Sequence, residues 1–309
     1  MSSSTQPDTV DNPLIILPTS PHTHTIILLH GRGSNATRFA FDTTIPTKPG
    51  FLQSHASSGL TLPQTFPGMK FIFPTAPKRR CTAKKRTKLN IWFDNSSFED
   101  PFAKEELQID GLCENTAAVR ELVLIEARTL CSLKKVFLGG ISQGCAIGLH
   151  VLLSLDTIRS GLSGGLGGFL GMSGWLPFQN SLEDIVSPLA DQDPEDGDDD
   201  DPFGLPDQND QKNSSGESEG VRVAQFVRED IMGTIRCPEV GLCFPSTPIL
   251  LGHGDQDDNV KLEHGESSMM VMKHLCEEVS WKVYEGQGHW YKVPEQIDDV
   301  VKFLKGNGC

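Results

Sequence analysis

The sequence contains no apolar run long enough to cross a membrane. A membrane-spanning helix needs about 20 consecutive, mainly apolar residues, whereas the longest apolar runs here, such as residues 26–29, have the length of a buried strand. The first 13 residues also lack the basic start and apolar core of a secretory signal, and no glycine follows Met1 as myristoylation requires. We therefore expect a cytoplasmic protein without an integral membrane span.

Paired cysteine motifs are also missing. None of the eight cysteines forms a CxxC pair, and their scatter along a long chain favours reduced thiols over a disulfide framework. Cys237 and Cys243 lie close together, but no neighbouring His or Cys completes a zinc-like set. The sequence predicts no metal site and no cofactor.

Basic residues are too few to balance the acidic ones, and the net charge is −14. The segment from Glu183 to Glu219 holds 14 acidic residues and one base, Lys212, so the rest of the chain carries only about −1. An acidic segment has been added to a nearly neutral domain, and the low pI therefore says little about the substrate. The negative charge disfavours nucleic acid as a partner, because the chain would repel phosphates.

Three regions are predicted to lie outside a single folded domain that spans residues 14–305. Residues 1–13 form a polar leader, and residues 306–309 form a tail. Residues 182–220 are predicted to be a disordered acidic insert, because they contain too little apolar surface to offset the entropy of ordering. An alternative hypothesis makes this insert the functional part, docking on a basic partner such as the chain's own basic run at 78–88.

Short apolar strands alternate with helical patterns along the domain. Strands are predicted at 26–29, 71–73, 136–138, 169–170, 249–251 and 281–284, and helices at 110–130, 145–155, 221–232, 260–277 and 294–304. The alternation predicts an α/β protein with a mostly parallel sheet and helices on both faces. Ligands bind at the carboxyl ends of such strands. Turns rich in polar residues follow Leu29, Leu138, Leu251 and Tyr284, all at that edge.

A G-x-S-x-G motif, formed by Gly140, Ser142 and Gly144, stands between a predicted strand and a predicted helix. In a nucleophile elbow, a sharp strained turn lifts the serine hydroxyl above the sheet edge, and side chains at the glycine positions would clash. The following helix adds N–H groups and a positive dipole end for developing negative charge. A chance glycine-rich turn is the alternative, but the flanking strand and helix favour the elbow.

A serine becomes a nucleophile when a histidine takes its proton and an acid orients that histidine. Of nine histidines, His289 alone follows both the serine and a candidate acid and lies in a glycine-rich loop after a late strand. His264 and His274 lie in a helical pattern typical of surface residues. His30 and His253 precede glycines at strand ends, where we expect them to hydrogen-bond their own loops.

The candidate acids are three aspartates in one turn, Asp255, Asp257 and Asp258. Spacing alone does not choose among them. At least one is expected to be a turn former whose carboxylate accepts backbone N–H groups.

Seven short motifs follow one another along the chain. They are residues 29–33 (LHGRG), 73–77 (FPTAP), 92–94 (WFD), 139–144 (GGISQG), 173–177 (SGWLP), 253–257 (HGDQD) and 288–289 (GH). Together they resemble the acyl-protein thioesterase and carboxylesterase branch of the α/β-hydrolases, which has lysophospholipase-like relatives, and they cover most of residues 25–178 and 247–305. The resemblance implies an α/β-hydrolase fold and a serine hydrolase that cleaves carboxylic esters or acyl thioesters.

The resemblance also implies roles for individual residues. Ser142 matches the family nucleophile, His289 the base and Asp257 the acid. The backbone N–H groups of Arg32 and Gln143 match the two oxyanion-hole donors.

Trp92 and Trp175 match binding-site wall residues, although packing in the core is an equal interpretation. The sequence departs from the family pattern in several places. Arg32 stands where the family usually has a compact uncharged residue, and 258–260 (DNV) replaces a common proline. No cysteine for N-terminal palmitoylation lies near Met1.

Two substrate classes therefore compete, small carboxylic esters and long-chain acyl thioesters on protein cysteines. The second would allow transient contact with a membrane surface. A different class of function is a catalytically silent hydrolase fold that binds a ligand or partner. Such proteins usually lose the nucleophile or the base, whereas Ser142, Asp257 and His289 are all present.

Overall fold

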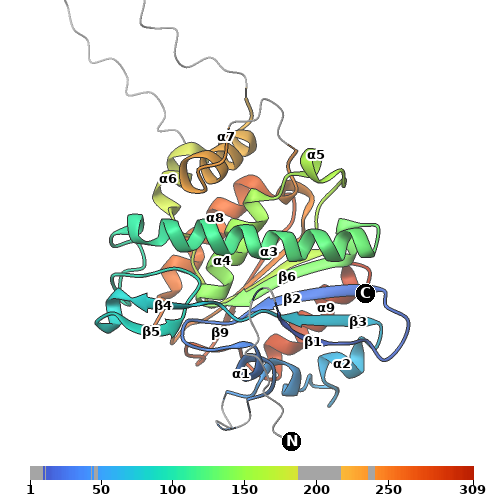
Figure 1. Cartoon of the computed structure of the whole chain (residues 1–309). Coiled ribbons are helices and arrows are strands. Elements are labelled where there is room, and N and C mark those ends of the chain that lie inside the picture. The colour runs from blue at the N-terminus through green and yellow to red at the C-terminus, as the bar shows by residue number, and fades with distance from the viewer. Residues whose placement is uncertain (1–9, 11, 43, 45–47, 187–216, 236–240) are drawn as a thin grey trace, which may run out of the picture.

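A seven-stranded sheet organises the chain (Figure 1). The computed structural model describes all residues except 1–9, 11, 43, 45–47, 187–216 and 236–240. The strands, in sheet order, are β1 (Leu14–Ile16), β3 (Met69–Phe73), β2 (His24–Leu29), β6 (Val136–Ile141), β7 (Gly168–Met172), β8 (Ile249–Gly254) and β9 (Val279–Tyr284). β1 pairs antiparallel with β3, and every other neighbouring pair is parallel. The predicted mostly parallel sheet is confirmed.

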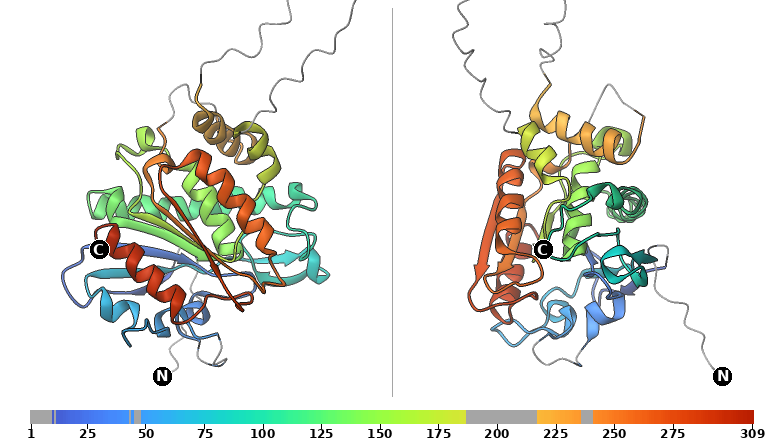
Figure 2. Two further views of the ribbon diagram at one scale, coloured as in Figure 1. Left: turned by 180° about the vertical axis from the view of Figure 1, so that it is seen from behind. Right: turned by 90° about the vertical axis from the view of Figure 1, so that its left-hand side faces the viewer.

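Helices cover both faces of this sheet (Figure 2). They are α1 (Ala36–Phe41), α2 (Leu62–Thr65), α3 (Ile109–Thr129), α4 (Gln143–Ser154), α5 (Thr157–Ser160), α6 (Gln179–Val186), α7 (Glu219–Gln225), a π-helical turn (Phe226–Ile231), α8 (Leu262–Leu275) and α9 (Glu295–Gly306). No helix in the part of the chain that the structure describes is long and apolar enough to cross a membrane.

Successive side chains of a strand point to opposite faces of the sheet, so each strand contributes to two apolar layers, one on each face. Ile27 and Leu29 of β2 belong to the layer that holds residues of α3, α4 and α8, whereas Ile26 and Leu28 belong to the layer that holds residues of α1 and α9. Because both faces are covered, β2 is a continuous apolar run rather than an alternating one.

The basic run at 78–88 forms a separate hairpin, β4 (Lys78–Cys81) paired antiparallel with β5 (Thr87–Asn90). Lys85 and Arg86 at its tip have positive φ. The hairpin is tied to the turn after β2, because the N–H of Gly33 donates to the carbonyl of Asn90 at 2.8 Å.

The predicted ends of the acidic insert and of the tail were wrong. Leu182 and Val186 are buried on α6, since apolar residues four positions apart share a helix face. α7 begins at Glu219, within the predicted insert, and the rest of the insert, 187–216, lies outside the described residues. The predicted leader is largely outside them as well. The predicted tail overlaps α9, and the N–H of Cys309 donates to the carbonyl of Leu304 at 3.1 Å.

Two buried histidines make folding sensitive to mild acid. Burial lowers the pKa of His30 and of His150 to about 4, whereas an unfolded histidine titrates near 6.5. Their contribution to stability is present above pH 6.5 and is lost as the pH falls toward 4, because the unfolded chain then binds protons that the folded chain does not. We expect each to cost about 2 kcal/mol of unfolding free energy at pH 5 relative to pH 8.

Urea unfolding at pH 8 and pH 5 measures this loss. The matched variant is His150→Gln, whose amide keeps a donor for the Pro177 carbonyl that the histidine Nε2 contacts at 3.1 Å. The pH-dependent loss should be about 2 kcal/mol smaller in the variant. An equal loss in the two proteins would show that His150 does not titrate as its burial requires.

Candidate active site

Ser142 stands in the turn between β6 and α4, in the geometry of a nucleophile elbow. Its backbone has φ +56° and ψ −124°, a strained conformation for a residue with a side chain. A Cβ on Gly140 would lie 2.5 Å from the backbone of Gly144, and one on Gly144 would lie 2.1 Å from the Leu29 carbonyl oxygen. Larger residues cannot occupy either position, which is the clash that the motif predicts.

Ser142, His289 and Asp257 form a continuous hydrogen-bonded chain. The Oγ of Ser142 lies 2.9 Å from Nε2 of His289. Nδ1 of the same ring lies 2.8 Å and 3.0 Å from the two carboxylate oxygens of Asp257. The structure thus brings together three residues that come from the ends of β6, β8 and β9, at the carboxyl edge of the sheet.

Asp257 is held as a carboxylate. Burial alone would raise its pKa, but contacts with His253 and His289 and the N–H of Val260 hold the pKa well below its usual range. Its Oδ1 accepts the N–H groups of Asn259 and Val260, both at 2.9 Å. Its side chain is fully buried, so solvent does not screen the charge from the imidazole of His289.

The other two aspartates of the turn do not reach His289. Oδ1 of Asp255 accepts the N–H of Gly286 at 2.7 Å, which braces the loop that carries the histidine. Asp258 is exposed. The structure therefore resolves what the spacing left open: Asp257 is the aspartate that contacts the imidazole.

The histidines at the strand ends bind their loops, as predicted. His30 accepts the N–H of Ala76 through Nε2 at 3.0 Å, and its Nδ1 lies 2.7 Å from the carbonyl of Gly31. His253 has Nε2 2.9 Å from the carbonyl of Val260 and 3.3 Å from Oδ2 of Asp257. The second contact makes His253 a support for the carboxylate, which the sequence did not predict; its place directly before Gly-Asp-x-Asp was the only signal.

The two predicted oxyanion donors flank Ser142. Gly31 packs against the nucleophile, since a Cβ on it would lie 3.3 Å from the Cβ of Ser142, and Arg32 follows it. Gln143 is the first residue of α4. Neither backbone N–H donates to a protein acceptor within the described residues. Their role as oxyanion-hole donors stays a prediction.

The side chain of Gln143 hydrogen-bonds the 92–95 loop. Its Oε1 accepts the N–H of Trp92 at 3.0 Å, and its Nε2 donates to the carbonyl of Phe93 at 2.7 Å and to Oδ1 of Asn95 at 2.9 Å. It fixes the 92–95 loop to the elbow.

Trp92 and Trp175 lie in the core rather than at the surface of the site. Trp92 is completely buried, and its indole N–H donates to the carbonyl of His30 at 2.8 Å. Trp175 is 2% exposed and meets the ring of Phe93 edge-on at 6.0 Å. Their assignment as substrate-binding residues stays a prediction, and neither lines the pocket beside Ser142.

That pocket has a volume of about 240 Å³. Besides Ser142 and His289, its wall includes three apolar side chains and two cations: Phe39, Ile141, Trp290, Arg32 and Lys48. Trp290 and Lys48 were missed from the sequence. Trp290 could have been found from its place next to His289, whereas Lys48 is far from every motif and comes to the pocket only through the fold.

Arg32 is partly buried and stacks on an aromatic ring. Its guanidinium carbon lies 3.8 Å from the centre of the Phe98 ring, which also lies 5.1 Å from Nζ of Lys84. Burial lowers the pKa of Arg32 to about 10, so it stays a cation at neutral pH.

Comparison with known proteins identifies the family of the chain. The model of the phospholipase/carboxylesterase family matches residues 10–192, more than half of the chain. The chain belongs to this family of α/β-hydrolases. Residues 234–306, which include Asp257 and His289, also match the prolyl oligopeptidase family.

Similarity to individual relatives extends over nearly the whole chain. This chain is 25% identical to acyl-protein thioesterase 1 of Gibberella zeae, over 95% of this chain and 94% of the relative. The Saccharomyces cerevisiae acyl-protein thioesterase 1 is 24% identical over 92% and 93% of the two chains. The crystal structure of Zea mays acyl-protein thioesterase 2 superposes with a TM-score of 0.62 at 25% identity, covering 96% of this chain and 98% of that one.

Proposed function

We propose that this carboxylesterase-family chain is an active serine hydrolase that cleaves carboxylic esters or acyl thioesters through an acyl-enzyme. The observation that carries the proposal is the contact of Ser142 Oγ with His289 Nε2 at 2.9 Å, together with the contact of the same ring with Asp257 at 2.8 Å. A serine, a base within hydrogen-bond reach and a buried acid that orients the base are the parts that acyl transfer requires.

In this mechanism Ser142 Oγ attacks the substrate carbonyl carbon while Nε2 of His289 takes its proton. The carbonyl oxygen becomes an oxyanion, which the N–H groups of Arg32 and Gln143 stabilise. The intermediate collapses, the bond to the alcohol or thiol breaks, and His289 returns the proton to the leaving group. Water then repeats the sequence on the acyl-enzyme, with His289 again as base, and releases the acid and free Ser142.

The pocket supports a preference for short acyl groups. Its volume of about 240 Å³ is below the roughly 300–1,000 Å³ typical of sites that enclose drug-sized ligands. A long acyl chain would extend beyond it and gain little apolar burial. Among the two substrate classes, we therefore favour small carboxylic esters and short acyl thioesters.

Two measurements test the proposal. A fluorophosphonate probe should label the protein at Ser142, because labelling requires an activated serine. Hydrolysis rates across p-nitrophenyl esters of increasing chain length, beside a palmitoyl-thioester peptide, should fall as the chain lengthens. An unlabelled, folded protein would mean a silent hydrolase fold, and a maximum at palmitoyl length would refute the short-chain preference.

Arg32→Ala separates the roles of the backbone and the side chain at this position. The variant keeps the backbone N–H that we assign to the oxyanion hole, and the loss of such a donor costs roughly 10²–10³ in kcat. We therefore expect kcat on p-nitrophenyl acetate to stay within about tenfold of wild type. The thermal midpoint should be measured beside it, because the variant loses packing on Phe98. A hundredfold loss of kcat at unchanged stability would give the guanidinium itself a part in the reaction.

A further inference from the structure

A second and larger cleft lies at the far end of α4 from Ser142. It has a volume of about 780 Å³, within the usual range for ligand sites. Ser142 precedes the first residue of α4 and Ser154 is its last, so the length of this 12-residue helix, about 18 Å, separates the cleft from the nucleophile. Arginines from three elements line it: Arg120 and Arg128 of α3, Arg159 of α5 and Arg228 of the π-helical turn.

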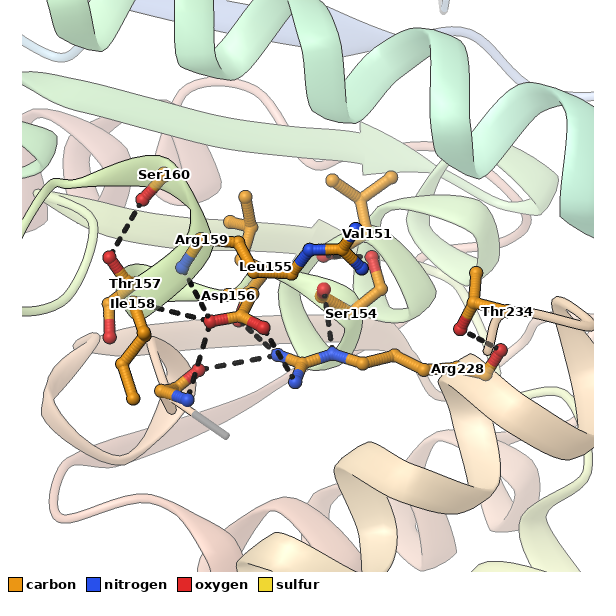
Figure 3. A network of polar contacts seen from close by, with 11 residues as sticks. Val151, Ser154, Leu155, Asp156, Thr157, Ile158, Arg159, Ser160, Arg228 and Thr234 are labelled. Carbon is orange, nitrogen blue, oxygen red and sulfur yellow. Dashed lines mark hydrogen bonds and ion pairs between the residues drawn. The ribbon is translucent and has the colours of Figure 1, made fainter. Parts of the chain in front are cut away.

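The guanidinium of Arg228 makes its contacts within the protein. It donates through Nε to the carbonyl of Ser154 at 3.1 Å and through Nη2 to that of Leu155 at 2.7 Å, where α4 ends without further helical partners. Its Nη1 lies 3.4 Å from Oδ2 of Asp156. Figure 3 shows this guanidinium at the centre of the network.

The carboxylate of Asp156 also makes its contacts within the protein. Its Oδ1 caps α5 by accepting the N–H groups of Ile158 at 3.0 Å and Arg159 at 3.1 Å. It also accepts the N–H of Gly241 at 3.3 Å. The carboxylate therefore pairs with Arg228 and caps the N-terminus of α5, and among the described residues it forms no ion pair with the guanidinium of Arg159.

Arg128 has its own partner, Glu121, at 3.3 Å. Four arginines and two carboxylates line the cleft, which leaves a net charge of +2. The excess lies on Arg120 and Arg159, neither of which has a carboxylate within 4.0 Å among the described residues. Burial first, and then the positive charge of Arg159, lower the pKa of Arg120. The negative charges of Glu121 and Asp156 act on Arg120 in the opposite direction. These two carboxylates form their ion pairs with Arg128 and Arg228, however, so the cleft keeps its net charge of +2.

We propose that this cleft is a second binding site, which takes a small phosphate monoester between Arg120 and Arg159. A phosphate monoester carries close to two negative charges at neutral pH, which matches the net charge of +2. Guanidinium groups bind its oxygens in pairs of parallel hydrogen bonds. The cleft also offers apolar contact to the organic part of such a ligand, through Leu124 and through Ile235, which is 92% exposed.

Calorimetric titration of the full chain with phenyl phosphate tests the site, with phenyl sulfate as a probe of the same shape and a single charge. Phenyl phosphate should bind with one-site stoichiometry and more tightly than phenyl sulfate. Arg120→Gln and Arg159→Gln should each weaken it about 10- to 100-fold, the usual effect of one hydrogen bond to a charged group. Phenyl phosphate should also raise the thermal midpoint of the wild type and leave that of the double variant unchanged.

Arg128→Gln is the matched control, because it removes a cleft arginine that is already paired and exposed; its effect should stay within about threefold. Esterase activity should be the same in all these variants, since none touches the pocket at Ser142. No saturable binding of phenyl phosphate, equal binding of phenyl sulfate, or equal weakening by Arg128→Gln would each overturn the proposal. Binding that survives the double variant and is lost in Arg32→Ala would place the anion at the other pocket and refute it too.

Discussion

Ser142→Ala is expected to lower kcat on p-nitrophenyl esters by about 10⁶, the loss seen when the nucleophile of a Ser-His-Asp triad is removed. The reason is that no other hydroxyl lies at Nε2 of His289 in the described structure, where Ser142 Oγ lies at 2.9 Å. The fold should survive. Alanine keeps the Cβ at the elbow, and the N–H of residue 142 still donates to the Met172 carbonyl, a contact of 2.8 Å.

The control is Ser34→Ala, which removes a second serine hydroxyl from the same pocket wall. Its kcat should match that of the wild type, and circular dichroism and thermal midpoints should be the same for all three proteins. Turnover by Ser142→Ala within tenfold of wild type would remove Ser142 from the mechanism and leave the proposed acyl-enzyme without a nucleophile.

The elbow could be predicted because its physical requirement is local. Gly140 and Gly144 must lack side chains, since the chain passes within 2.1–2.5 Å of where a Cβ would stand. That requirement appears in five consecutive residues, and the strand and helix around it show their own periodicity. The same holds for the strands buried on both faces, such as β2, whose apolar character does not depend on which neighbour covers them.

Features that depend on long-range packing were not predictable. β4 and β5 contain four basic residues among their eight and no apolar alternation, and the contact of Gly33 with Asn90 that ties them to the turn after β2 joins distant parts of the chain. α6 was not predicted because its sequence is mainly polar or acidic, and three apolar residues, Leu182, Ile185 and Val186, suffice to pack it against the core. The pocket wall is a further example, since it joins the distant residues Lys48 and Trp290.

Asp257→Asn is expected to lower kcat by about 10⁴, as the equivalent change does in serine proteases with this triad. The amide oxygen can still accept the N–H groups of Asn259 and Val260, now 2.9 Å from Oδ1, so the loop keeps its shape. The amide nitrogen then faces Nδ1 of His289 as a donor. The imidazole must present a lone pair there and carry its proton on Nε2, where it cannot accept the proton of Ser142.

The neighbouring aspartates supply controls that differ only in position. Asp258 is exposed, and Asp258→Asn should leave kcat and stability unchanged. Asp255→Asn keeps an acceptor for the Gly286 N–H but removes its charge, so we expect it to lower the unfolding free energy by about 1 kcal/mol with little change in kcat. Steady-state kinetics and urea unfolding of the three variants separate these effects. If Asp255→Asn gave the largest kinetic loss in a folded protein, the acid would be two residues earlier, and the 2.8 Å contact between Asp257 and His289 would not be the one that orients the base.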